Sequence, residues 1–499
     1  MYIKYAFLVL FVAVMIGVGI YSRRKISSVQ DFLLGGRKMG AWMSAFAYGT
    51  TYFSAVIFIG YAGKSGWGFG LSATWIGIGN AVIGSLLAWL VLAKRTRRMT
   101  HELNASTMPE FFEKRYNSKA MKIVTAIIIF VFLVPYSASV YQGLSYLFER
   151  AFGIPFEYCM IAMAVLTAVY LLLGGYIATA INDFIQGIIM IIGIILMIIF
   201  VVTNPTVGGL GEGIKKLSEI PGDGPGLVSI FSRQPLNLLA LIVLTSLGTW
   251  GLPQMVHKFY AIKDETAIKK ATVVSTLFAA LIGGGAYFVG AFGRIYLDNQ
   301  VPVVNGKANF DMIVPMMLEK SLPEALMAVV IVLVLSASMS TLSSLVLVSS
   351  SAISLDLLKG TLFPKMKKEW VMVIMRVLCV LFVALSLVVA LTPNAILTLM
   401  SFSWGTIAGA FLAPFVYGLY WKGTTKAGAW AGFITGFGCS IGGTLIYGMN
   451  AQYAPNIGAF AMIASLVVVP VVSLVSSKLA KKSDETAYGK VLVEAEADI

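Results

Sequence analysis

The residues with the clearest chemistry are four small or hydroxyl-bearing residues in one apolar stretch. Ala337, Ser340, Thr341 and Ser344 lie at positions i, i+3, i+4 and i+7 of a run that extends from Leu322 to Ile353. In a helix, this spacing places their oxygens along one stripe, which suits a small hard cation. Close packing of membrane helices, or serines bonded to the preceding turn, would give the same pattern, so both interpretations stay open.

The composition indicates a polytopic membrane protein. Of 499 residues, 58% are hydrophobic and 12% are charged, and the mean hydropathy is +0.85. The polar intervals are too short for an independent domain, so we expect one all-α unit embedded in the lipid bilayer. The net charge of +14 is spread over alternate loops, which indicates membrane topology and not nucleic-acid binding. No catalytic or nucleotide-binding motif stands out, so we expect a protein that is not an enzyme and has no obligate protein partner.

About thirteen apolar stretches are long enough to span a membrane. Basic residues gather in the intervals that follow odd-numbered spans, which predicts an external N-terminus and a cytoplasmic C-terminus in the plasma membrane. These intervals are 23–38, 94–122, 258–270, 359–368, 422–426 and the tail from 478. A short uncharged turn over 174–179 separates the fifth and sixth spans.

Two predicted spans carry helix-weakening sequences near their centres. The second span, Ala41–Tyr61, contains a Gly and several hydroxyl side chains at 48–54, and the seventh contains two Gly and a Pro at 246–254. A break would expose backbone carbonyls, which is tolerable in a membrane only around a polar cavity or an ion. The second span could equally be continuous. Interrupted spans five apart predict two inverted repeats, spans two to six and seven to eleven.

Asp183 is an informative ionisable residue because it lies near the start of the sixth predicted span. A carboxylate there is suited either to capping the helix N-terminus or to binding a cation. The sequence alone leaves these two interpretations open.

Several short passages, taken in order, resemble the sodium:solute symporter family, which includes bacterial proline, pantothenate, monocarboxylate and sialic acid symporters. The passages are Asp31–Arg37, Ser54–Gly60, Thr107–Phe111, Gly174–Gly175 with Asp183 and Gln186, and Ser340–Ser343 with Asp356. The resemblance implies inverted five-helix repeats of the LeuT type. It divides the chain into an extra N-terminal helix and loop (1–40), a first repeat (41–203), a second repeat (236–421), two extra helices (422–478) and a cytoplasmic tail (479–499).

The resemblance also implies sodium as the coupling ion. It maps a first sodium site onto Thr50, Phe53, Ala337, Ser340 and Thr341. Some relatives hold a second sodium ion, whose pattern maps onto Asp183, Ser343 and Ser344, with Ser340 shared. The carboxylate also occurs in relatives not thought to use a second ion, so one and two ions both stay open.

The expected substrate is a small organic solute, either an amino acid such as proline or a small carboxylate. This chain has Tyr52, Thr245 and Thr249 where proline symporters have an Asp and an aromatic pair, which weakens the proline assignment. Residues expected near the two breaks are Thr51, Tyr52, Ser54, Tyr136, Tyr141, Gln142, Trp250 and Gln254. The alternatives to a sodium symporter are a membrane sensor on the same scaffold and a proton-coupled amino acid permease.

Overall fold

The computed structural model describes residues 2–23, 33–304, 306–392 and 394–479. Side chains are described for the same residues except 22–23, 170–175, 177–178, 368 and 478–479. Asp31, Phe32, most of the first basic interval and the tail from 480 therefore lie outside the described residues.

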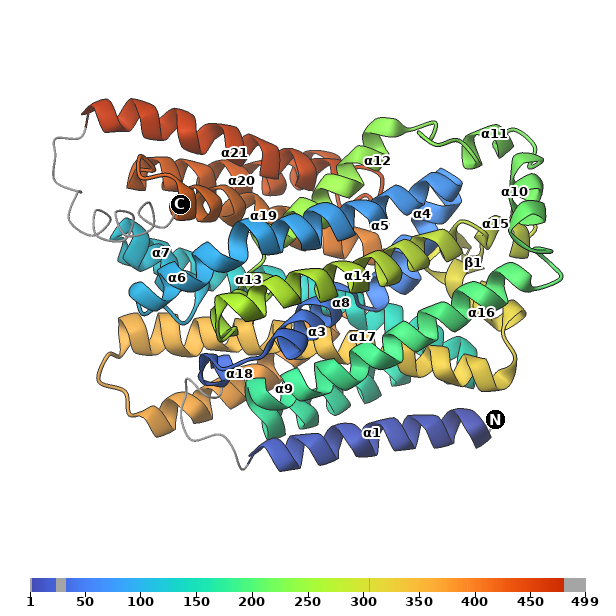
Figure 1. The fold of residues 1–499 in the computed structure, drawn as a ribbon, viewed down its shortest axis with the longest axis horizontal. Coiled ribbons are helices and arrows are strands. Elements are labelled where there is room, and N and C mark those ends of the chain that lie inside the picture. The colour runs from blue at the N-terminus through green and yellow to red at the C-terminus, as the bar shows by residue number, and fades with distance from the viewer. Residues whose placement is uncertain (1, 24–32, 305, 393, 480–499) are drawn as a thin grey trace.

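The chain forms a bundle of long helices, as the apolar periodicity predicts (Figure 1). The first part contains α1 (Tyr2–Arg23), η1 (Gly35–Arg37), α3 (Ala41–Tyr52), η2 (Val56–Tyr61), α4 (Ala62–Phe69), η3 (Gly70–Ala73), α5 (Thr74–Ala81), η4 (Val82–Leu87), η5 (Trp89–Ala93), α6 (Lys94–Glu102), α7 (Met108–Tyr116), α8 (Lys119–Phe152) and α9 (Phe156–Thr203). A connecting region follows with α10 (Leu210–Ser218) and α11 (Gly224–Leu227).

The second part begins with another broken segment. It contains α12 (Pro235–Ile242), η6 (Val243–Leu247), η7 (Gly248–Trp250), α13 (Pro253–Ala261), α14 (Glu265–Gly290), α15 (Gly293–Tyr296), the antiparallel strands β1 (Val303–Val304) and β2 (Lys307–Ala308), η8 (Phe310–Met312), α16 (Ile313–Ser321), α17 (Glu324–Ser351), η9 (Ala352–Leu362), α18 (Lys368–Ala390), α19 (Ile396–Tyr420), α20 (Lys426–Tyr447) and α21 (Ala454–Leu479).

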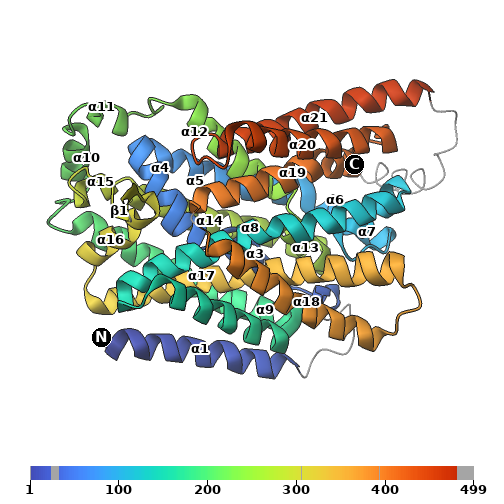
Figure 2. The same cartoon turned by 180° about the vertical axis from the view of Figure 1, so that it is seen from behind.

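Within the described residues, 11 helical stretches are long and apolar enough to cross a membrane. The two further spans predicted from sequence are the broken second one and the shorter apolar stretch Phe156–Val169. Figures 1 and 2 place the start of α1 and the end of α21 at opposite ends of the bundle, as an odd number of crossings requires. The protein is therefore a multi-pass all-α membrane protein.

The fifth and sixth predicted spans form one helical element, α9, of 48 residues. A straight helix of this length would extend about 72 Å, more than twice the thickness of a bilayer core. Both ends of α9 nevertheless lie near the 309–321 segment. At the start of α9, the ring of Phe156 packs against that of Tyr146 with 4.6 Å between the ring centroids, and the Tyr146 hydroxyl accepts a hydrogen bond from Asn309. Just after the end of α9, the Asn204 side chain donates to the Ser321 carbonyl. Therefore α9 must double back, although no non-helical turn separates its two halves.

Both predicted breaks are present. The helix α3 ends at Tyr52, Phe53 adopts an extended conformation, and the next helical segment starts at Val56. In the second half, α12 passes through η6 and η7 before Leu252, again extended, and α13 begins at Pro253. Each break follows the positions where Gly, Pro and hydroxyl residues weaken the helix.

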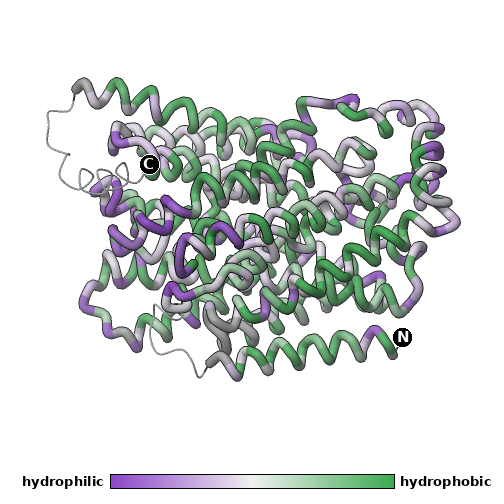
Figure 3. The backbone as a smooth tube through the Cα atoms, viewed as in Figure 1, coloured by the Kyte–Doolittle hydropathy of each residue, from purple (hydrophilic) through white to green (hydrophobic). Residues whose placement is uncertain are grey.

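The basic interval 258–270 was assigned wrongly as a loop. His257 and Lys258 belong to α13 and are buried, with 7% and 2% exposure, and α14 already starts at Glu265. The interval 94–122 also contains helices, α6 and α7. Figure 3 shows hydrophilic segments gathered around α6 and α7, at the end of the bundle that we call the basic end. Hydropathy alone assigns Lys258 to the loop, because it cannot distinguish a buried lysine from the exposed basic residues that follow it in the sequence.

The C-terminal helix α20 packs on α19 through a direct backbone contact. A Cβ atom added at Gly436 would overlap the carbonyl group of Gly409, whereas one added at Gly438 would meet nothing within 4 Å. We expect Gly436→Ala to cost roughly 1–3 kcal/mol through overpacking and to lower the midpoint of thermal unfolding of the purified protein. The matched control Gly438→Ala should leave the midpoint unchanged or raise it, and equal effects of the two changes would contradict the contact.

Candidate sodium and substrate site

The predicted first sodium site is assembled between α3 and α17. The Ser340 hydroxyl donates to the Thr50 carbonyl over 2.7 Å and lies 3.2 Å from the Ala337 carbonyl. The Thr341 hydroxyl lies 3.0 Å from the Ala337 carbonyl and 3.3 Å from that of Thr50. Four of the five predicted ligand groups thus converge, all on residues with at most 1% exposure.

The fifth group, the Phe53 carbonyl, belongs to the break itself. Because Phe53 is extended, its carbonyl leaves the helical pattern of α3, while the Ala55 amide donates to the Ser338 hydroxyl of α17 over 3.3 Å. The break is therefore held against α17 on both sides of the candidate site. A cluster of carbonyl and hydroxyl oxygens fits sodium, which takes oxygen ligands and needs its water shell replaced.

The predicted second sodium ligands each have other neighbours in this structure. Ser340 belongs to the first site, and the Ser343 hydroxyl donates to the Ser340 carbonyl of its own helix over 2.8 Å. Ser344 lies 3.0 Å from the Thr51 hydroxyl. Asp183 is buried in α9, and neither of its oxygens accepts a hydrogen bond from the described residues, since Thr50 donates to the Phe46 carbonyl. The helix-cap interpretation of Asp183 is therefore not supported.

Sequence reasoning missed the residue that faces Asp183. The Lys258 ammonium lies 4.0 Å from the Asp183 carboxylate and donates to the Ser344 hydroxyl over 3.0 Å. It also lies 5.3 Å from the centre of the Tyr176 ring. No sequence signal pairs Lys258 with Asp183, because they are far apart in the chain and Lys258 precedes a basic run.

Three of the predicted substrate residues lie around the first break. Tyr52 donates to the Thr245 carbonyl over 2.7 Å, which links the two broken segments directly. The ring of Tyr52 stacks on Trp404 of α19 at 6.3 Å, and Tyr136 meets the same indole edge-on at 5.6 Å. Ser54 is buried at the break. These residues form an aromatic wall with few polar groups.

The other predicted substrate residues point to different neighbours. Gln142 donates to the Ala390 and Thr392 carbonyls at the end of α18, and the Trp250 indole donates to the Ile83 carbonyl. Thr51 faces Ser344, and Gln254 is buried in α13. Tyr141 lies beside Thr167 of α9. The eight residues therefore do not share one space in this conformation, and their role in binding stays a prediction.

Trp404 is a candidate site residue that sequence reasoning missed. It is 1% exposed, and its indole N–H has no acceptor among the described residues. A buried donor without an acceptor is costly, so a bound solute with an acceptor group would be favoured here. Its position beside both Tyr52 and Tyr136 depends on the tertiary packing of α19, which no local sequence pattern reveals.

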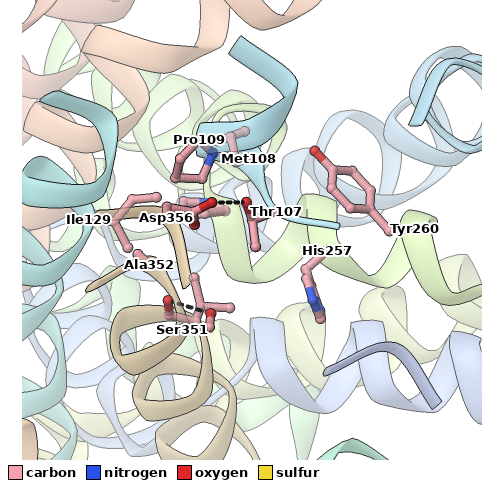
Figure 4. A pocket seen from close by; sticks show the side chains of 11 residues that line it. Thr107, Met108, Pro109, Ile129, His257, Tyr260, Ser351, Ala352 and Asp356 are labelled. Atoms are coloured by element: carbon pink, nitrogen blue, oxygen red, sulfur yellow. Dashed lines mark hydrogen bonds between the residues drawn. The ribbon is translucent and has the colours of Figure 1, made fainter. Parts of the chain in front are cut away.

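A small pocket lies on the basic side of the breaks (Figure 4). Its lining residues are Thr107, Met108, Pro109, Ile129, Pro253, His257, Tyr260, Val348, Ser351, Ala352 and Asp356. None of the predicted substrate residues is among them. Figure 4 shows Thr107, at the start of α7, joined to Asp356 by a hydrogen bond of 2.8 Å. This bond connects α7 to η9 in the wall of the pocket.

Polar contacts also join separate segments at the opposite end. Tyr61 and Ser401 share a hydrogen bond of 2.7 Å, which ties η2 to α19. Asp311, in the connection between β2 and α16, accepts the amide of Ile396 at the start of α19 over 3.1 Å. Burial raises the pKa of the Asp311 carboxyl to about 6, against the opposing effects of this amide and of Lys64.

The profile of the sodium:solute symporter family matches residues 32–436, which includes both breaks and the α17 stripe. The chain belongs to this family. The sodium/proline symporter of Staphylococcus aureus (strain bovine RF122 / ET3-1) is 31% identical over 98% of this chain and 95% of the relative. The osmoregulated proline transporter OpuE of Bacillus subtilis (strain 168) is 28% identical over 96% of this chain and 95% of the relative.

Solved structures show the same fold for this symporter. The structure of a Na+-coupled sialic acid symporter in its substrate-bound outward-open state superposes with a TM-score of 0.74 and 18% sequence identity. The match covers 94% of this chain and 97% of the sialic acid symporter chain. Mhp1, a nucleobase-cation-symport-1 family transporter, superposes with a TM-score of 0.52 and 13% sequence identity. This match covers 91% of the present chain and 97% of the Mhp1 chain. The predicted family and LeuT-type fold are confirmed, and the chain is a sodium-coupled symporter of small solutes.

Proposed function

We propose that this symporter imports a small amino acid, with proline as the first candidate, together with sodium bound by Thr50, Phe53, Ala337, Ser340 and Thr341. The observation that carries the proposal is the convergence of α3 and α17 oxygens at the first break. The Ser340 hydroxyl donates to the Thr50 carbonyl across the helix contact, and the Thr341 hydroxyl lies between the Ala337 and Thr50 carbonyls. Bound sodium would replace these hydrogen bonds by ion–oxygen contacts and hold α3 against α17.

The coupling follows from this arrangement. The proposed first repeat (41–203) contributes α3, and the second (236–421) contributes α17, so sodium bridges parts that move relative to each other in alternating access. An ion that binds one conformation more tightly shifts the population toward it. Each charge that moves inward across 100 mV contributes about 2.3 kcal/mol, which is available to concentrate the solute.

The nature of the substrate is inferred from the residues around Tyr52. Tyr52, Tyr136 and Trp404 offer apolar rings to a small aliphatic group, and the Trp404 N–H offers one donor to a carboxylate or carbonyl. Proline has both parts and is transported by the named relatives. Tyr52 stands where proline symporters carry an Asp, so the amino group of the substrate would be bound differently here.

Uptake into proteoliposomes tests this proposal. We expect an inward sodium gradient to drive accumulation of radiolabelled proline, and an equal potassium gradient to drive none. Competition by unlabelled pantothenate, sialic acid and short monocarboxylates, each in excess, measures specificity, and the Trp404→Phe variant should bind the preferred solute more weakly because it removes the N–H donor. Sodium-driven uptake of another solute but not of proline would refute the substrate assignment.

The same assay separates the alternative functions. Uptake that follows a proton gradient and ignores sodium would indicate a proton-coupled permease, and solute binding without uptake would indicate a sensor. We further propose that the protein resides in the plasma membrane, with the basic end in the cytoplasm and the start of α1 outside, as the distribution of basic residues predicts. It acts as a transporter without a catalytic role.

A further inference from the structure

The place where the resemblance implies a second sodium ion already faces a positive charge that belongs to the chain. The Lys258 ammonium lies 4.0 Å from the Asp183 carboxylate and donates a hydrogen bond to the Ser344 hydroxyl. Asp183 and Ser344 are two of the four implied ligands. Lys258 is 2% exposed and Asp183 is 1% exposed. The residues present therefore do not fit a second sodium ion in this conformation.

The surroundings of Lys258 suit an ammonium group. An ammonium carries only donors, and here it has the Ser344 hydroxyl as a hydrogen-bond acceptor, the Asp183 carboxylate as a counter-ion and the face of the Tyr176 ring at 5.3 Å. A buried carboxylate without hydrogen bonds needs a compensating charge, and Lys258 forms the ion pair that the described residues give to Asp183.

The remaining implied ligands are committed elsewhere. The Ser343 hydroxyl donates to the Ser340 carbonyl, and the Ser340 hydroxyl faces the Thr50 carbonyl at the first site. A sodium ion placed at Asp183 would therefore find one shared carboxylate and a like charge beside it. Like charges in a buried site repel strongly because the local dielectric constant is low.

We propose that the ammonium group of Lys258 takes the place of a second sodium ion, so that this chain binds a single sodium ion in each transport cycle. The inference rests on the proposed function, because it counts the ions of that same symport. The ammonium is fixed to α13, so it neutralises Asp183 without crossing the membrane. Solute accumulation is then limited by the gradient of one sodium ion, not of two.

The pair also connects parts that belong to different proposed repeats. Asp183 is in α9 of the first repeat, whereas Lys258 and Ser344 are in α13 and α17 of the second. An attached cation keeps this connection at any sodium concentration, whereas a second sodium ion would make it only when bound. Sodium dependence therefore resides in the first site alone.

Equilibrium binding of radiolabelled sodium to the purified full chain tests the inference. We expect one ion per wild-type protein and a hyperbolic titration. Lys258→Arg keeps a cation beside Asp183, so the count should stay at one. Lys258→Gln keeps hydrogen-bonding capacity but removes the charge, so the free carboxylate should recruit a second ion, and the count should rise to two.

The outcomes separate the inference from the proposed function. Two ions on the wild-type protein, or a count that stays at one in folded Lys258→Gln, would overturn the inference and leave sodium symport intact. No saturable sodium binding by the wild-type protein would overturn both. If Lys258→Gln does not fold, the wild-type count and the sodium-to-solute ratio from reversal potentials still decide, with a ratio of two refuting the single-ion cycle. The neutral pair Asp183→Asn with Lys258→Gln should again bind one ion.

Discussion

Replacing Ser340 or Thr341 by alanine should weaken the apparent affinity of sodium about tenfold each, equivalent to about 1.4 kcal/mol. Each change removes one hydroxyl that faces the Thr50 and Ala337 carbonyls and takes away little volume. The double variant should lose sodium-driven uptake almost completely, because both side-chain oxygens of the site are gone. The measurement is the sodium concentration that gives half-maximal uptake in proteoliposomes.

Ser350→Ala is the matched control for these variants. Ser350 lies in the same helix and is fully buried, but its hydroxyl donates to the Val346 carbonyl of its own helix over 2.7 Å. Its removal should leave the half-maximal sodium concentration unchanged. If Ser340→Ala and Thr341→Ala behave like Ser350→Ala, then the stripe on α17 serves helix packing, and sodium must bind elsewhere.

Asp183→Asn should destabilise the protein by about 3–5 kcal/mol, because it leaves the buried ammonium of Lys258 without its counter-charge. We expect lower yields in the membrane and a lower midpoint of thermal unfolding in detergent. Replacing both residues, with Asp183→Asn and Lys258→Met together, should recover most of the lost stability, since neutral side chains of similar size then fill the same space. Thermal unfolding of the wild type, of Asp183→Asn, of Lys258→Met and of the double variant forms a double-mutant cycle that measures the coupling.

Asp298→Asn provides the control for the chemical change itself, since Asp298 is exposed in the turn after α15. It should leave stability unchanged. A stable Asp183→Asn protein with weakened sodium binding would show instead that the carboxylate binds the ion. That result would contradict the pairing with Lys258 from a direction independent of the ion count.

The break in the seventh predicted span and the α17 stripe could be predicted from sequence because each depends on local chemistry, whereas the same chemistry left the second span either broken or continuous. Gly, Pro and hydroxyl residues inside an apolar run are unfavourable for a continuous helix, and the breaks at Phe53 and Leu252 follow them closely. The stripe follows from helical spacing alone, and Ser340 and Thr341 do face Thr50. The resemblance to a family added which carbonyls take part.

The features that were missed depend on contacts between distant segments. Lys258 was assigned to a loop because it precedes other basic residues, and only the packing of α13 against α9 and α17 reveals its burial. Trp404 looks like an ordinary apolar residue of α19 until Tyr52 and Tyr136 are placed on it. Trp250 is close to a break in sequence and Gln142 is an amide within an apolar span, yet the donors of both are used by backbone carbonyls elsewhere.

The close approach of Gly436 to Gly409 also affects how motion of this protein can be observed. This backbone contact and the hydrogen bond between Thr406 and Ser440 join α20 to α19, so we expect α20 to follow a tilt of α19. Ile434, in α20, is 66% exposed on the outside of the bundle. A spectroscopic probe attached there would report the orientation of α19, and with it the position of Trp404, from the lipid side and without entering the ion pathway.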